Sequence, residues 1–123
     1  MADNDLRVIV KAKELMKHTY TLTSNINRYP KKYRHSLVDR MQIISMDIYE
    51  YLLDANRISN LTDKRLRCET ITKGITGCDK LLTYIELSME LNLLNPSSAD
   101  YWSKMVSDVK HMAIAWRTSE KKQ

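Results

Sequence analysis

Apolar residues recur at helical spacing in four separate stretches of this chain. In the first stretch, from about residue 5 to 27, the stripe consists of Val8, Ala12, Leu15, Thr19, Leu22 and Ile26. Alternating steps of four and three place such residues on one face of a helix. Stretches at about 30–55, 61–91 and 97–118 repeat the pattern. The sequence therefore predicts four amphipathic α-helices.

The other three stripes have the same period. The second consists of Leu37, Met41, Ile44, Ile48, Tyr51 and Ala55. The third consists of Cys68, Ile71, Ile75, Cys78, Leu82, Ile85 and Met89. The fourth consists of Trp102, Met105, Val109, Met112 and Trp116. Each stripe nearly repeats every seven residues, and helices with this repeat pack side by side at small left-handed crossing angles.

Three short breaks separate the predicted helices: Tyr29-Pro30, residues 56–60 and Asn95-Pro96. Proline disfavours helix at the residue before it and suits the first turn of the next helix. Short connections favour antiparallel neighbours. We therefore expect one domain, residues 1–123, that is all-α and forms an antiparallel up-down-up-down four-helix bundle.

The residues at the breaks also suggest how the helices begin. Asn60 is expected to cap the third helix. The fourth is capped either by Asn95 with Pro96 in the first turn, or by Ser97 with Asp100 three residues later. After about residue 118 the chain turns polar and is expected to fray.

The third helix contains both glycines and both cysteines of the chain. Gly74 and Gly77 each cost it about 1 kcal/mol relative to alanine, so either a neighbouring helix approaches closely there or the helix bends. Cys68 and Cys78 are the only cysteines and lack metal-ligand spacing. Both are expected to be buried, with free thiols.

Composition agrees with long helices. Only 2 of the 123 residues are glycine and 2 are proline, whereas all-β folds need many tight turns. No stretch approaches the ~20 apolar residues of a membrane span. The N-terminus is polar and lacks the apolar region of a signal peptide. We therefore expect a cytoplasmic protein that does not contact membranes.

The net charge of +5 is distributed unevenly. The densest basic cluster lies where the first helix is expected to meet the second, with Tyr29 and Tyr33 between the cations. Its members are Arg28, Lys31, Lys32, Arg34, His35 and Arg40. A second cluster, at the opposite pole of the predicted bundle, includes Lys64, Arg65 and Arg67. Cations beside aromatic rings suit phosphates and unpaired bases; a solvated face that keeps the protein soluble is the alternative.

Motifs of enzymes and metal sites are absent from the sequence. His18, His35 and His111 fall on three different predicted helices, and no phosphate-binding glycine loop, Gly-x-Ser-x-Gly or His-Glu-x-x-His occurs. The Glu-x-x-His motifs of a di-iron bundle are missing as well. We therefore expect no catalytic residues, no metal and no cofactor.

The segment 27–41, followed by Ile48-Tyr49-Glu50, resembles the junction and second helix of a family of small four-helix-bundle proteins. The most specific part is Tyr29-Pro30-Lys31, followed by Leu37 and Arg40. One branch of the family is the accessory variability determinant of diversity-generating retroelements. The related branch is encoded by intervening sequences in 23S ribosomal RNA genes.

The resemblance implies a non-catalytic accessory subunit that forms a basic homopentamer. Such subunits bind a retroelement reverse transcriptase and its template RNA, or RNA/DNA, and support mutagenic reverse transcription. The residues that match the family's junction are Arg28, Lys31, Lys32, Arg34 and Arg40. His35, Lys64, Arg65 and Arg67 are assigned to nucleic-acid binding from charge alone. The 23S-related branch implies instead a protein-interaction scaffold.

Apolar residues outside the stripes independently favour an oligomer. They are Ile43, Tyr49, Leu53, Leu81, Tyr84 and Leu87. Extra apolar faces of this kind fit helix packing between subunits. A wide core stripe within one subunit is the alternative.

Overall fold

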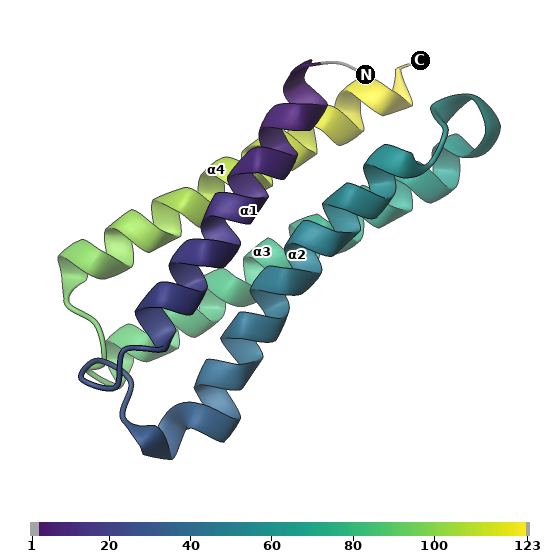
Figure 1. Cartoon of the computed structure of the whole chain (residues 1–123). Coiled ribbons are helices and arrows are strands. Elements are labelled where there is room, and N and C mark those ends of the chain that lie inside the picture. The colour runs from purple at the N-terminus through teal and green to yellow at the C-terminus, as the bar shows by residue number, and fades with distance from the viewer. Residues whose placement is uncertain (1–2, 123) are drawn as a thin grey trace.

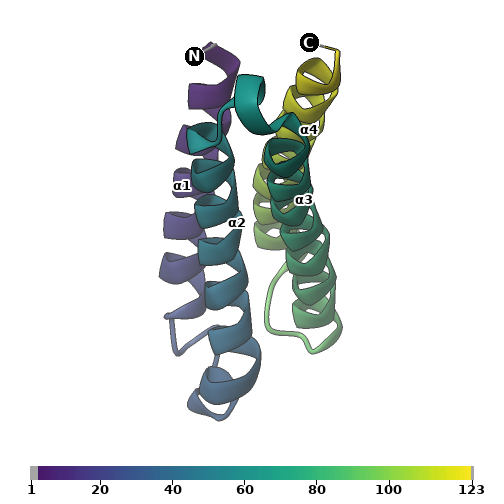
Figure 2. The same cartoon turned by 90° about the vertical axis from the view of Figure 1, so that its right-hand side faces the viewer.

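Four long helices lie side by side, each antiparallel to the next (Figures 1 and 2). The computed structural model describes residues 3–122 and the side chains of residues 7–122. Its long helices are α1 (Asp3–Thr23), α2 (Asp39–Arg57), α3 (Asn60–Glu90) and α4 (Pro96–Lys121). A 3₁₀ turn, η1 (Lys31–Tyr33), and a π-helical turn, η2 (Arg34–Val38), lead into α2.

Consecutive helices contact each other, and α1 contacts α4 to close the ring. The predicted up-down four-helix bundle is therefore confirmed. The α1–α2 junction and the α3–α4 connection lie at one end, and the α2–α3 connection lies with the chain termini at the other (Figure 1). Within residues 3–122, no helix is both long and apolar enough to cross a membrane.

The core follows the predicted stripes with small changes in rotation. Leu52 and Leu81 are fully buried, whereas their predicted neighbours Tyr51 and Leu82 are only partly buried. Ile26, predicted to end the first stripe, is 55% exposed because α1 has already ended. An α-helix has 3.6 residues per turn, so a stripe read at 3.5 drifts around the helix.

The helix ends show which predicted caps form. Asn95 caps α4 by accepting a hydrogen bond from the Ser98 N–H at 2.8 Å, as the first alternative predicted. The prediction that Asn60 caps the third helix is wrong, because Ser59 accepts the Leu61 N–H at 3.2 Å. The backbone leaves helical geometry at Asp63, whose carboxylate then accepts the Leu66 N–H at 3.1 Å and restarts the helix.

Gly74 and Gly77 mark a close approach between α3 and α2. A Cβ at position 74 would lie 2.9 Å from Leu52 Cδ2, and one at position 77 would lie 2.7 Å from Ile48 Cγ1. The glycines therefore allow close approach of a neighbouring helix, which was the first of the two explanations predicted. Cys68 and Cys78 are buried as free thiols, as expected, and burial raises the pKa of Cys78 to about 12.

Gly77→Ala is expected to lower the free energy of unfolding by about 1 kcal/mol. Overpacking a core costs about 1–3 kcal/mol, and the gain in helix propensity offsets about 1 kcal/mol of it. Urea unfolding followed by circular dichroism measures the difference.

The control for this substitution is Thr76→Ala, at the exposed neighbouring position of α3, which should be neutral or slightly stabilising. In an Ile48→Ala background, Gly77→Ala should stop being destabilising, because the atom that the new methyl group strikes is gone. An equal loss in both backgrounds contradicts the close-approach explanation.

Candidate nucleic-acid interface

Asn25 organises the turn that connects α1 to the basic junction. Its side-chain oxygen accepts the Asn27 N–H at 2.9 Å. Its backbone oxygen accepts the N–H groups of Arg28 at 3.0 Å and Tyr29 at 2.8 Å. Asparagine side chains stabilise such turns in competition with helix. For this reason α1 ends at Thr23, which corrects the predicted end near residue 27.

Tyr29 anchors this turn to the core. Its side chain is buried, so the expectation that Tyr29 offers a stacking surface among the cations is wrong. Burial raises the pKa of its phenol to about 12, against the smaller opposing effects of the Ser88 hydroxyl and the Arg28 charge. The phenol therefore stays neutral. Pro30 follows in an extended conformation, and the chain turns from it into η1.

The start of the predicted second helix is not α-helical. The Arg34 N–H bonds to Lys31 O, a 3₁₀ spacing, and the Asp39 N–H bonds to Arg34 O, a π spacing. The wide π turn places the consecutive residues Leu37 and Val38 both in the core. This corrects the prediction of one α-helix from residue 30. π turns are rare in proteins, and those that occur inside helices are often found at functional sites.

The irregular start exposes three cations: Lys31, Lys32 and Arg34. The first turns of η1 and η2 contain no acidic residue, and no side chain caps either of them. Cations at a helix N-terminus oppose the helix dipole by a few tenths of a kcal/mol each. The Lys32 ammonium lies 5.3 Å from the ring centroid of Tyr33. The turn is therefore unfavourable for its own helix and favourable for a bound anion.

The remaining junction residues differ in exposure. Arg40 is exposed, and the exposed His35 imidazole lies 3.6 Å from the Asp39 carboxylate. Arg28 is partly buried, and its Nη1 donates to Ser98 Oγ at 2.8 Å. This contact joins the α1–α2 junction to the first turn of α4, across seventy residues of sequence. No pattern in the sequence indicates it.

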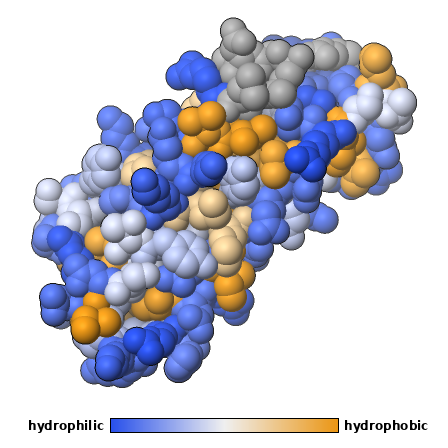
Figure 3. All heavy atoms as spheres, viewed as in Figure 1, coloured by the Kyte–Doolittle hydropathy of each residue, from blue (hydrophilic) through white to orange (hydrophobic). Residues whose placement is uncertain are grey.

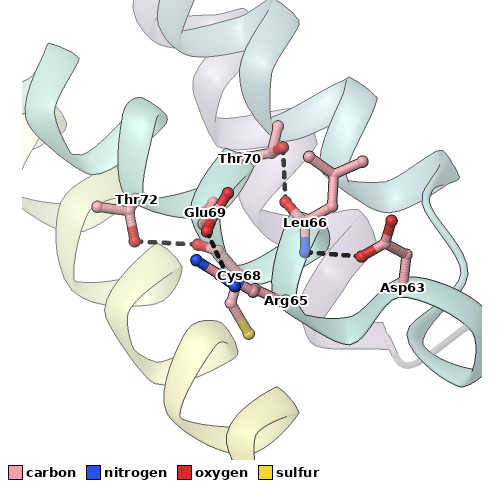
Figure 4. Close-up of polar contacts among 7 residues, drawn as sticks. All are labelled: Asp63, Arg65, Leu66, Cys68, Glu69, Thr70 and Thr72. Carbon is pink, nitrogen blue, oxygen red and sulfur yellow. Dashed lines mark hydrogen bonds and ion pairs between the residues drawn. The ribbon is translucent and has the colours of Figure 1, made fainter.

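Two of the predicted residues at the opposite pole lie on the surface of α3. The Arg65 side chain is 89% exposed and lies 2.9 Å from the Glu69 carboxylate. Figure 4 draws this pair. Lys64 is partly buried beside it. Both line a hollow of about 490 Å³ between α3 and α4 that also includes Cys68 and Lys121. They lie at the opposite end of the bundle from the junction cations (Figure 1), so the nine predicted residues do not form one surface.

Arg67 belongs to a buried network at that pole. Its side chain is 11% exposed and pairs at 2.9 Å with Glu120, which is 6% exposed. Its Nη1 also donates to the Ile58 carbonyl at 2.8 Å, and its guanidinium lies 5.3 Å from the Trp116 ring centroid. This placement corrects the expectation that Arg67 lies on a basic surface.

Glu120 receives two further hydrogen bonds that complete this network. The Trp116 indole N–H donates to it at 2.9 Å, and the Asn60 amide donates to its other oxygen. Asn60 thus holds the end of α4 instead of capping α3. The predicted fraying after residue 118 is wrong for residues up to Lys121, where α4 ends; Gln123 lies outside the described residues.

Neither the described side chains nor a family model assigns this site. Among residues whose side chains are described, no group of three His, Cys, Asp or Glu residues could hold a metal ion. No protein-family model matches the sequence, and no curated protein matches it.

Arg67→Ala is expected to lower the free energy of unfolding by about 3 kcal/mol, because it leaves the buried Glu120 carboxylate without its cation. Arg65→Ala removes an exposed pair on the same helix and should change stability by less than about 0.5 kcal/mol. Chemical denaturation of both variants measures the contrast. Similar small losses for the two would contradict a structural role for Arg67.

Proposed function

We propose that this chain is a non-catalytic, basic nucleic-acid-binding accessory subunit of a retroelement reverse transcriptase. The proposal joins the resemblance of the junction to accessory variability determinants with the charge of that junction. In it, the chain binds the polymerase and its template RNA, or RNA/DNA, and supports mutagenic reverse transcription. Lys31, Lys32 and Arg34 are the principal phosphate-binding groups, and Arg28, His35 and Arg40 flank them.

The observation that carries the proposal is the exposed, acid-free helix start at the junction. From residue 24 to residue 38 the chain has no acidic residue. Its three exposed cations lie at the helix N-terminus, where their charge opposes the helix dipole. A phosphate backbone provides the missing negative charge and releases its own counterions on binding. The surface of this end is largely hydrophilic in the face shown in Figure 3.

Lys31→Glu, Lys32→Glu and Arg34→Glu together are expected to abolish most RNA affinity. If each cation neutralises one phosphate, the slope of log affinity against log salt should fall by about 2 to 3. Filter binding of a structured RNA, measured across a series of salt concentrations, tests this. The three side chains are exposed, so the melting temperature should change little.

The matched control replaces Lys13, Lys80 and Lys122 with glutamate. These lysines are also exposed and lie outside the junction, so the net charge changes equally. The control should keep most of the affinity. Equal losses in both triple variants would indicate nonspecific attraction, and a wild-type affinity that does not depend on salt would contradict the proposal.

A second candidate function, a protein-interaction scaffold, is favoured by apolar side chains left on the surface. Ile43 on α2 and Leu87 on α3 are 48% and 38% exposed. Leu81, which was expected beside them, belongs to the core instead. In this alternative the chain binds a protein partner. Recovery of that partner after nuclease treatment, without retained RNA, would distinguish this function from nucleic-acid binding.

The same two side chains support the proposed homopentamer. Light scattering is expected to give a mass about five times the 14.4 kDa of one chain. Ile43→Lys with Leu87→Lys should shift the mass toward one chain, because charges in an apolar interface remain desolvated. Leu61→Lys, at a 96% exposed position of the opposite pole, should not. A wild-type mass of one chain contradicts the oligomer.

A further inference from the structure

A hollow of about 360 Å³ lies on the α1–α4 side of the junction. α1 contributes His18 and Leu22, the junction contributes Arg28, and the beginning of α4 contributes Ser97, Ser98 and Tyr101. One end of the hollow is polar and cationic, and the other is aromatic. It thus combines a cationic group, which suits the phosphate of a nucleotide, with an aromatic ring, which suits its flat base.

Arg28 gives the polar end a fixed positive charge. The 2.8 Å hydrogen bond from its Nη1 to Ser98 Oγ holds the guanidinium in the wall of the hollow. A guanidinium has five N–H donors in a planar fork, and hydrogen bonds from it to phosphate are charge-assisted. The Ser98 backbone N–H already donates to Asn95. The Ser98 N–H is therefore not free to bind an anion in this hollow.

Tyr101 gives the other end an aromatic surface that is 61% exposed. The ring of His18 meets it edge to face, with centroids 5.3 Å apart and planes at 72°. His18 in turn contacts the buried Trp102, whose indole N–H donates to the buried Thr19 hydroxyl at 3.1 Å. The exposed ring is therefore supported from the core, so a partner that stacks on it meets a partly ordered surface.

Tyr101 also borders a second hollow, of about 240 Å³, farther along the same two helices. That hollow contains Lys11 and Lys104 together with two acids, Glu14 and Asp108. The ring thus stands between two spaces, one of them next to Arg28. Burial lowers the pKa of His18, so its imidazole is neutral at pH 7 and the fixed charge beside the first hollow is that of Arg28.

We propose that the hollow beside Arg28 binds one unpaired nucleotide of a single-stranded RNA or DNA. Its phosphate pairs with Arg28 and the serine hydroxyls, and its base stacks on Tyr101. The inference rests on the proposed function, because the junction cations bring the strand to this face. It adds a preference for unpaired over paired nucleic acid, since a base inside a duplex cannot present its face to a ring.

Tyr101→Ala is expected to weaken binding of a single-stranded oligonucleotide about tenfold, the usual scale of one base–aromatic stack. Binding to a duplex of equal length should not change. The slope against salt should also stay constant, because no charge is removed. Tyr101→Phe, which keeps the ring, should bind like the wild type. Fluorescence anisotropy with labelled single-stranded RNA, single-stranded DNA of the same sequence and the duplex provides these measurements.

Arg28→Gln tests the phosphate end of the same hollow. It should weaken single-strand binding and reduce the salt slope by about 0.7, the value for one phosphate of a single strand. If only the RNA arm responds to Tyr101→Ala, the nucleotide bound is a ribonucleotide; equal responses mean that the subsite accepts both sugars. The melting temperatures of the two Tyr101 variants should stay near that of the wild type, because Tyr101 is mostly exposed.

The outcomes separate this inference from the proposed function. If Tyr101→Ala leaves single-strand affinity unchanged while the triple junction variant loses it, the subsite is wrong and the basic junction stands. Equal weakening of single strand and duplex by Tyr101→Ala also overturns the subsite. If the wild type shows no salt-sensitive affinity for any of the three probes, both proposals fail.

Discussion

The close contact between α2 and α3 is the constraint on which the rest of this structure depends. Gly74 and Gly77 let Ile48 and Leu52 approach the α3 backbone, at a cost of about 1 kcal/mol of helix propensity per glycine. The contact fixes the rotation and height of α2 relative to α3. Toward the junction, Ser88 of α3 lies against Met41 of α2. The seam between these helices therefore determines where the basic turn can be anchored.

One cation is buried and paired at one pole of the bundle, whereas others are exposed at the opposite pole. At the pole of the termini, Arg67 is enclosed by a carboxylate, a carbonyl and an indole ring, and so is already neutralised and desolvated. At the junction, Lys31 and Arg34 are exposed on turns with no acid at their start. The same charge thus stabilises the fold at one end and works against a helix at the other. The asymmetry is the strongest physical reason to place a polyanion at the junction.

Hydrophobic period, together with the proline and asparagine breaks, was sufficient to predict the fold class and the helix order, because burial of one stripe per helix leaves few alternatives for a chain of this length. It could not predict absolute rotation, so Leu52 and Leu81 lie deeper than their predicted neighbours. Nor could it predict the π turn that brings Leu37 and Val38 both into the core. Charge clustering grouped Arg67 with exposed cations because sequence does not show that Glu120 reaches it from the end of α4.

The α1–α4 face shows why a candidate site of this kind escapes a search along the sequence. Arg28 and Tyr101 are more than seventy residues apart and belong to different motifs, and only the return of α4 beside α1 brings both to one hollow. An isolated exposed tyrosine on a helix is ordinary. Here it is supported by His18 and Trp102 and stands beside an arginine that Ser98 holds in place. In the proposed binding mode, the junction charge pairs with the phosphates and the aromatic surface stacks on a base, so a strand that follows this face is bound first by its phosphates and then selected by its unpaired base.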